Sequence, residues 1–269
     1  MTIAEAMKLG PRPQDMRLLL EHILNVDRLY LIAHTEEVLT AEQIKQVKNG
    51  VQRLNDGEPI TKILGVREFY SRKFKVTKHT LDPRPDTEWI IDSVLKTVES
   101  PNRILDLGTG TGCILITLLL ECPKASGVGV DISREALQVA QENATKHKIQ
   151  ARSEFICSNW GEKLVDQFDV IVSNPPYIKT EDIHHLDRNV RDYDPFLALD
   201  GGESGLEAYK LIAADISRLL HPQGRCFIEI GIGMVEDVIK VFQQNGLQHT
   251  ETIKDLSNID RCLVFKKQH

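Results

Sequence analysis

The sequence of 269 residues lacks the features that mark secreted, membrane-bound and metal-clustered proteins. Its five cysteines, an odd number, contain no Cys-x-x-Cys pair, so we interpret them as reduced thiols and not as a disulfide framework. No secretory leader pattern and no apolar run of membrane-spanning length is present. The adjacent His184 and His185 would point in different directions on a regular element, which argues against a metal site. We therefore expect a cytoplasmic protein without a membrane segment or a bound metal.

Positive charge is also scarce. Lysine and arginine number 33 against 39 aspartate and glutamate residues, and the formal net charge is −6. No overall field therefore favours nucleic acid. The most basic stretch lies in residues 67–79, and we interpret it as the solvated face of a hairpin in preference to a track for phosphates. We expect no direct contact with nucleic acid.

The alternation of strands and helices is absent from the first quarter of the chain. Residues 1–67 show helical patterns only, with apolar residues at three- and four-residue spacing in 16–24, 30–33 and 42–54. Residues 68–81 alternate as in a hairpin, and a proline cluster follows. From about residue 84 onward, strands and helices alternate. These patterns predict a helical domain in 1–67, a β-hairpin linker in 68–83 and an α/β domain with a largely parallel sheet in 84–269.

A strand, a glycine turn and a helix follow one another at residues 103–121. The strand Arg103–Leu107 leads into Gly108-Thr109-Gly110-Thr111-Gly112, where glycines let the backbone turn sharply and approach a ligand closely. Cys113 stands where a dinucleotide fingerprint needs its third glycine, so a pyrophosphate is not the favoured ligand. A second strand, 127–130, ends at Asp131, where a carboxylate meets ribose hydroxyls in mononucleotide folds. Taken singly, these are an ordinary turn and a helix cap. Together they predict a site for an adenosine-containing cofactor.

Asn174-Pro175-Pro176-Tyr177 directly follows a third apolar strand, Phe168–Ser173. The two prolines fix the backbone and donate no hydrogen bonds, so the loop is stiff. The Asn174 side-chain oxygen and the Pro175 carbonyl can each accept one N–H of an amide or aromatic amine, while Tyr177 covers the planar group. The alternative is a proline-rich turn whose tyrosine packs on the core. The first interpretation predicts a pocket for a planar nitrogen nucleophile.

Two of these motifs resemble known ones. The run Asp106–Gly112 resembles the cofactor motif of class I S-adenosylmethionine methyltransferases, and Asn174–Tyr177 resembles the motif of their amino-methylating branch. Three more segments, Gly-Glu-Pro-Ile at 57–60, Gly-Val-Arg-Glu-Phe-Tyr at 65–70 and Pro-Arg-Pro-Asp-Thr-Glu at 83–88, narrow the resemblance to the HemK/PrmC family. The resemblance covers nearly the whole chain.

This resemblance implies a function and a fold. The family transfers a methyl group from S-adenosylmethionine to the side-chain amide nitrogen of the glutamine in the Gly-Gly-Gln motif of class I peptide chain release factors. It implies a class I methyltransferase domain, Rossmann-like with a mostly parallel seven-stranded sheet, behind a small N-terminal helical domain that recognises the release factor. It further implies S-adenosylhomocysteine as the product, and we expect a monomer.

The resemblance also assigns residues. It implies a catalytic role for Asn174, Pro175 and Tyr177, and substrate binding by these three together with Pro176. The residues implied to bind the cofactor are Asp106, Gly108, Thr109, Gly110, Thr111, Gly112, Asp131, Asn159, Trp160 and Asn174.

Some positions depart from the family or stay open. Asn159 stands where the family often has aspartate, and Asp82 where an apolar residue is usual. Trp160 either packs on the purine or belongs to the core. Glu88 starts a helix, and the resemblance adds a place near the methionine end of the cofactor. Glu229 ends a strand-like run and either lines the site or caps the next helix.

Three other functions compete with this one. A methyltransferase acting on the exocyclic amine of adenine in DNA or RNA would use the same loop for a flipped base, but the acidic composition weighs against it. A non-catalytic protein that binds a partner through its helical domain is disfavoured by the presence of both the cofactor and the amine motifs. An NAD-dependent dehydrogenase is weakened by the missing third glycine.

Overall fold

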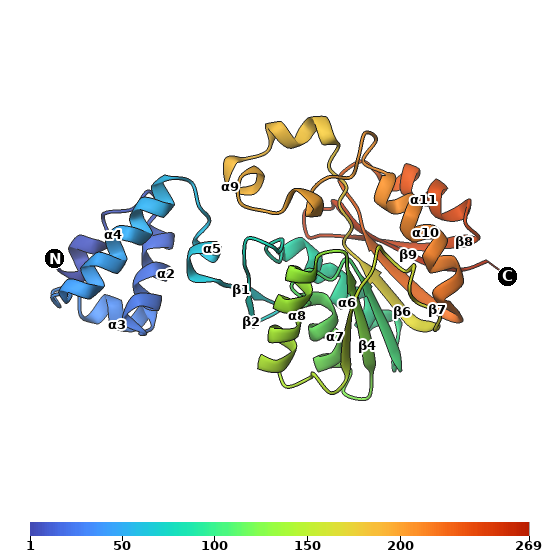
Figure 1. Cartoon of the computed structure of the whole chain (residues 1–269), viewed down its shortest axis with the longest axis horizontal. Helices are drawn as coiled ribbons and strands as arrows, with labels where there is room; N and C mark the ends of the chain where they lie inside the picture. The colour runs from blue at the N-terminus through green and yellow to red at the C-terminus, as the bar shows by residue number, and fades with distance from the viewer. Residues whose placement is uncertain (269) are drawn as a thin grey trace. The chain divides into compact units, whose positions relative to one another are not determined.

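The computed structural model describes residues 1–268. This part of the chain divides into two compact units, each with its own core (Figure 1). Residues 1–66 and 187–193 form a helical unit, and the remaining described residues form an α/β unit.

The helical unit surrounds a small apolar core that includes Met16, Leu20 and Val47. Gly50 allows two of its helices to pack closely, because a Cβ there would lie 2.6 Å from Leu19 Cδ2. The three predicted helices are confirmed, and one of them begins before Met16 because Pro13 suits a first helical turn. The helices of this unit are α1 Ile3–Ala6, α2 Pro13–Leu24, α3 Arg28–Ala33, α4 Ala41–Asn55, α5 Ile60–Leu64 and α9 Arg188–Arg191.

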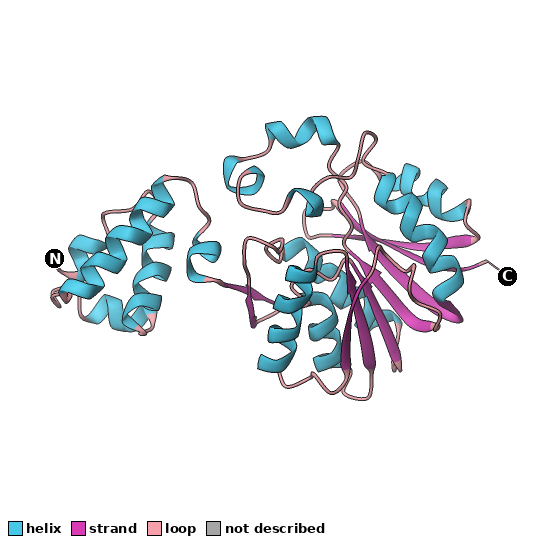
Figure 2. Cartoon of the chain, in the orientation of Figure 1, coloured by secondary structure: helices cyan, strands magenta, loops and turns pink. Residues whose placement is uncertain are grey.

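The α/β unit is built on a seven-stranded sheet with the order β5-β4-β3-β6-β7-β9-β8 (Figure 2). Neighbours from β5 to β7 are parallel, and β9 is antiparallel to both β7 and β8. The order reverses at β3, which places the crevice for a ligand at the carboxyl ends of β3 and its neighbours. The strands are β3 Arg103–Leu107, β4 Ser126–Asp131, β5 Ser153–Cys157, β6 Phe168–Ser173, β7 Leu220–Glu229, β8 Leu247–Lys254 and β9 Asp260–Lys267.

Helices cover both faces of this sheet, as Figure 1 shows. Side chains alternate across β3, so Ile104 joins one core cluster while Leu105 and Leu107 join the other. One face packs against α6 Glu88–Thr97, α7 Cys113–Glu121 and α8 Arg134–Lys146, and the other against α10 Glu207–Leu219 and α11 Val235–Gln243. The predicted fold, a mostly parallel seven-stranded methyltransferase-type sheet preceded by helices, is confirmed.

The predicted hairpin is present but shorter than expected. Its strands are β1 Val66–Phe69 and β2 Arg72–Lys75. Tyr70 and Ser71 join them with φ of 49° and 57°, as a two-residue hairpin turn requires. The expected alternation up to residue 81 was wrong beyond Lys75, because a turn at 77–80 replaces the strand.

The segment after β6 is partly helical. It contains the short 3-10 helices η2 Thr180–His185 and η3 Phe196–Ala198, with α9 between them. The charged stretch 187–194, which the sequence leaves open as an exposed loop or a contact for the protein substrate, includes one helical turn, and Tyr193 Oη donates to the Asp56 carbonyl at 3.2 Å. Every helix in the described part of the chain is too short or too polar to cross a bilayer.

Candidate active site

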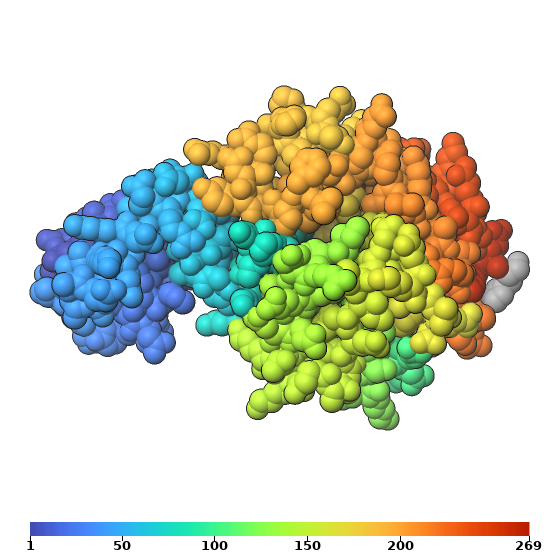
Figure 3. Space-filling model, viewed as in Figure 1, coloured from blue at the N-terminus to red at the C-terminus, as the bar shows by residue number. Residues whose placement is uncertain are grey.

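A cavity of about 610 Å³ lies within the α/β unit at the carboxyl ends of β3, β4 and β6. In Figure 3 the orange-yellow surface that follows α9 and the green surface of α8 border a hollow on this side of the unit. The predicted residues that line the cavity are Gly108, Gly110, Asp131, Asn159, Trp160, Asn174 and Pro176. One cavity therefore brings together residues from both predicted motifs.

The glycine loop turns between β3 and α7 with three glycines at positive φ. Gly108, Gly110 and Gly112 have φ of 76°, 53° and 78°, a conformation that other residues rarely adopt. A Cβ on Gly110 would meet nothing within 4 Å, so this backbone faces open space in the cavity. A Cβ on Gly112 would lie 2.9 Å from Ile116 Cδ1 and 3.2 Å from Ala140 Cβ. Gly112 thus serves the close packing of α7 on α8, whereas Gly110 leaves room for a ligand.

Asp106 lies beneath this loop, fully buried. Its Oδ2 accepts a hydrogen bond from Thr109 Oγ1 at 2.7 Å. Burial raises the pKa of Asp106 to about 7, although the Thr109 hydroxyl opposes the rise. Thr111 is also buried, and its carbonyl accepts from Asn143 Nδ2 at 2.9 Å. In this structure Asp106, Thr109 and Thr111 brace the glycine loop from below.

Asp131 ends β4 beside the loop. Its Oδ2 accepts from the Gly110 amide at 2.9 Å, and its Oδ1 accepts from the Ser133 amide at 2.9 Å. Burial raises the pKa of Asp131, and these backbone hydrogen bonds oppose that rise. The side chain of Ser133, not that of Asp131, caps α8 by accepting from the Ala136 amide. Asp131 therefore joins the glycine loop to the start of α8 with its carboxylate on the cavity.

Trp160 forms part of the cavity wall after β5. It is a half-buried residue at φ 48°, and a Cβ on Gly108 would lie 3.3 Å from its Cζ3 atom. The preceding Asn159 is exposed, and its Nδ2 donates to Glu162 Oε1 at 2.8 Å. Trp160 also packs against the core, so both interpretations of this residue describe its position.

Asn174 follows β6 at the cavity edge. Its Nδ2 donates to Thr87 Oγ1 at 3.1 Å, which leaves its side-chain oxygen outside this hydrogen bond. Pro176 lines the cavity, while Pro175 is buried beside it. An amide oxygen on a rigid loop is a suitable acceptor for a planar N–H group.

Tyr177 packs against the core of the α/β unit. A Cβ on Gly231 would lie 3.0 Å from Tyr177 Cδ2, so this glycine makes room for the ring. Burial, with the nearby Glu229 carboxyl group, raises the pKa of the Tyr177 hydroxyl. The Tyr177 ring therefore packs on the core, which is the alternative to covering a planar substrate that the sequence left open.

Two further polar groups lie beside Asn174: Thr87, which received no role of its own from the sequence, and Glu229, for which the sequence left open a place in the site or a helix cap. Thr87 is buried at the start of α6, and Glu229 is buried at the end of β7. Glu229 does not cap α11, whose N-cap residue is Met234. The signal that singled out Glu229 in the sequence was a carboxylate at the end of a strand-like run. Glu88, in contrast, accepts from the Tyr70 amide at 2.7 Å and so anchors the hairpin turn.

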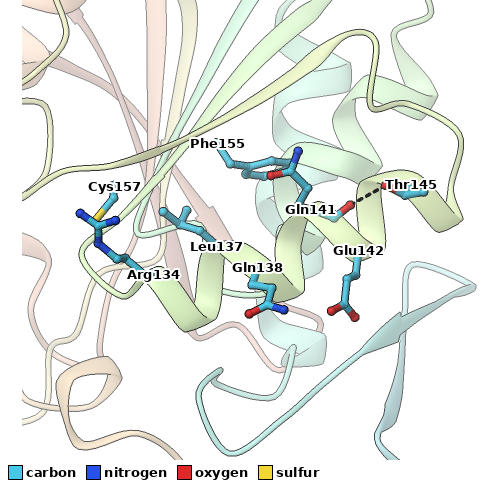
Figure 4. Close-up of a pocket in the computed structure, with 8 residues that line it drawn as sticks. All are labelled: Arg134, Leu137, Gln138, Gln141, Glu142, Thr145, Phe155 and Cys157. Carbon is cyan, nitrogen blue, oxygen red and sulfur yellow. Dashed lines mark hydrogen bonds between the residues drawn. The ribbon is translucent and has the colours of Figure 1, made fainter.

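A second hollow lies between α8 and the edge strand β5 (Figure 4). Side chains from both elements face it, including Leu137 and Phe155. Thr145 Oγ1 donates to the Gln141 carbonyl at 2.9 Å along its rim. None of the predicted site residues lines this hollow. Nor does any group of three or more His, Cys, Asp or Glu in residues 1–268 have a metal-binding arrangement.

Comparison with protein families gives two matches. Residues 7–65 match the PrmC N-terminal domain, and residues 99–258 match a methyltransferase domain.

Curated relatives match along most of the chain. A release factor glutamine methyltransferase of Agrobacterium fabrum is 42% identical over 94% of this chain and 90% of its own length. A protein of the same name from Rhodospirillum rubrum is 40% identical over 95% of this chain and 79% of its own.

Solved structures share the fold. A methyltransferase from Pyrococcus furiosus superposes with a TM-score of 0.58 at 15% identity, covering 82% of this chain and all of its own.

Proposed function

The chain belongs to the release factor glutamine methyltransferase family, and we propose from this that it methylates the side-chain amide nitrogen of a glutamine in a peptide chain release factor. The methyl donor in this proposal is S-adenosylmethionine, and the target is the glutamine of the Gly-Gly-Gln motif. The observation that carries the proposal is the single cavity shared by the glycine loop and the Asn174 loop.

The cavity residues fit an adenosine-containing cofactor. Gly110 faces open space, Asp131 offers a carboxylate for ribose hydroxyls, and the Trp160 ring borders the space where a purine can lie. Bound S-adenosylmethionine supplies an electrophilic methyl group on its sulfonium. The chain's residues must then hold the glutamine amide in line with that methyl group.

Placement is the main catalytic resource in this reaction. An amide nitrogen is a weak nucleophile because its lone pair is delocalised into the carbonyl. Orientation can contribute roughly 7–11 kcal/mol, compared with about 0.5–1.5 kcal/mol for one ordinary hydrogen bond. We propose that the Asn174 side-chain oxygen and the Pro175 carbonyl accept the two amide hydrogens. They also stabilise the positive charge that develops on nitrogen.

The helical unit is proposed to recognise the release factor, and the chain is proposed to act as a monomer. A family model of its own matches residues 7–65, which supports a distinct task for this unit. Adenine in DNA or RNA is the alternative substrate, since its exocyclic amine is also planar. The net charge of −6 favours the protein substrate.

Mass spectrometry tests the proposal. The purified chain is incubated with S-adenosylmethionine and a release factor, and in parallel with a release factor whose Gly-Gly-Gln glutamine is changed to alanine. We expect one added methyl group on that glutamine and none on the changed protein. Single-stranded and duplex DNA form further arms. Methylated adenine without methylated glutamine would replace this proposal with the nucleic-acid one.

A further inference from the structure

Glu229 is a carboxylate enclosed in the protein beside Asn174. It ends β7 and is 4% exposed. In the parallel pairing of β6 with β7, Ser173 lies opposite Ile228, so the next residues along the two chains are Asn174, just after β6, and Glu229, which still pairs with Cys262 of β9. A buried charge is costly unless other groups donate hydrogen bonds to it. Its partners therefore indicate what it does.

Asn174 and Thr87 are those partners. Asn174 Nδ2 donates to Thr87 Oγ1 at 3.1 Å, and hydrogen bonding by both side chains opposes the rise in the pKa of the Glu229 carboxyl group. The Glu229 Oε2 atom is buried without a hydrogen-bond partner. An amide nitrogen has two hydrogens, and a hydroxyl can accept one hydrogen bond while donating another. An ionised carboxylate only accepts. The three contacts are compatible with one another when the Asn174 nitrogen points inward, toward Thr87 and Glu229, and the buried Glu229 Oε2 can then accept a further N–H or O–H.

We propose that Glu229 is a positioning residue that, together with Thr87, fixes the Asn174 amide with its oxygen toward the substrate. This inference rests on the proposed function, because the orientation matters only if Asn174 accepts a hydrogen bond from the substrate amide. With the amide reversed, Asn174 would present N–H groups to the N–H groups of the glutamine. Glu229 acts through Asn174 and does not touch the reacting atoms.

The charge of Glu229 depends on its surroundings. Burial raises its pKa to about 7, while Thr87, Arg261 and Asn174 oppose the rise and Asp86 adds to it. Arg261 in turn is paired with Asp86 at 3.1 Å and with Asp255 at 2.8 Å. The other titratable groups that interact electrostatically with Glu229 are Cys113, Tyr177, Tyr209 and Cys262. Burial raises the pKa of each of these four, so Glu229 is the group among them that changes charge near neutral pH.

Steady-state kinetics of Glu229→Gln test this positioning. The variant keeps the shape of the side chain but adds an N–H donor that competes with the inward orientation of Asn174. We expect kcat for glutamine methylation to fall about 10- to 100-fold, with cofactor affinity changed by less than about threefold. Thr87→Ser should retain most activity and Thr87→Val should lose it, because only serine keeps the hydroxyl. Glu142→Gln, at an exposed glutamate of α8 paired with Lys75, is the matched control.

The pH profile separates positioning from a structural role. The ionised form accepts more strongly from both partners, and the protonated form adds an O–H donor that competes with the inward orientation of Asn174, so the kcat of the wild-type protein should fall as the pH drops through about 7. Asp106 also has a pKa of about 7, so Glu229→Gln should lose the component of the pH dependence that Glu229 contributes and keep any component due to Asp106. A Glu229→Gln protein with the kcat and pH profile of the wild type would overturn the proposal.

A readout without substrate distinguishes this proposal from the proposed function. The side-chain NH2 resonances of Asn174, identified by their loss in Asn174→Ala, should shift with pH in the wild type and stay constant in Glu229→Gln. If the Asn174 amide titrates in this way but the protein methylates no release factor, the positioning by Glu229 is supported and the proposed function is refuted. If the protein methylates the release factor but the Asn174 amide does not titrate, the positioning role of Glu229 is refuted and the proposed function stands.

Discussion

At the scale of single residues, Asn174 is the side chain whose position in the structure bears most directly on the proposed reaction. Its amide nitrogen is held by Thr87, and its oxygen is the group proposed to accept from the substrate. Correct orientation of the substrate amide lowers the barrier by more than the strength of one hydrogen bond. An acceptor that is out of place therefore raises the barrier by more than the loss of that bond alone. Asn174 should therefore affect the rate of methyl transfer far more than the binding of either ligand.

Asn174→Ala is expected to lower kcat about 10²- to 10³-fold, by analogy with the loss of one hydrogen bond that stabilises a transition state. Cofactor affinity, measured by calorimetry, should change by a modest factor only, because the glycine loop and Asp131 are untouched. Asn102→Ala, at an exposed asparagine before β3, is the control. Turnover of Asn174→Ala equal to that of the control would refute the assignment.

The glycine loop shows, at the scale of elements, that one motif can serve two purposes. Gly110 and Gly112 both have positive φ, so alanine strains the backbone at either position. Only at Gly112 does the added Cβ also crowd Ile116 and Ala140. The conformation of the turn and the packing of α7 on α8 therefore depend on different glycines.

Gly112→Ala should lower the free energy of unfolding by about 1–3 kcal/mol more than Gly110→Ala, because overpacking adds to the strain. Gly110→Ala should instead weaken cofactor binding, since its Cβ projects into the cavity. Urea denaturation and calorimetry on both variants measure the two effects. Equal loss of stability in the two variants would show that backbone strain alone, without overpacking, determines the cost of each substitution.

Elements with an uninterrupted apolar run between clear breakers were predictable from sequence. The bounds of β3, β6 and α7 match the predicted ranges, because glycine or proline marks where the chain must turn. The hairpin was predicted too long, since Val76 is buried and continues the alternation although the strand has ended. The contact of Thr87 with Asn174 was beyond sequence reasoning. It joins segments far apart in the chain, and only the sheet order brings them together.

At the scale of the whole molecule, the candidate site belongs to one unit. All residues that line the cavity lie in the α/β unit, and the helical unit has a separate apolar core. Residues 7–65 of the helical unit match a separate family model, which is consistent with a task other than cofactor binding. The cofactor and the target glutamine should thus bind in the α/β unit, and the rest of the release factor should be recognised by the helical unit.

Hydrogen exchange with mass spectrometry on the intact chain tests this division. A ligand that binds only the folded state suppresses local opening of the segments around it. Addition of S-adenosylmethionine should therefore slow exchange in peptides covering 106–112, 128–136 and 158–162, and leave α2 and α4 unchanged. Adenosine triphosphate, which shares the nucleoside but lacks the sulfonium and the methionine, serves as the control. Protection of α2 or α4 by S-adenosylmethionine alone would contradict the division and would show that the cofactor also orders the helical unit.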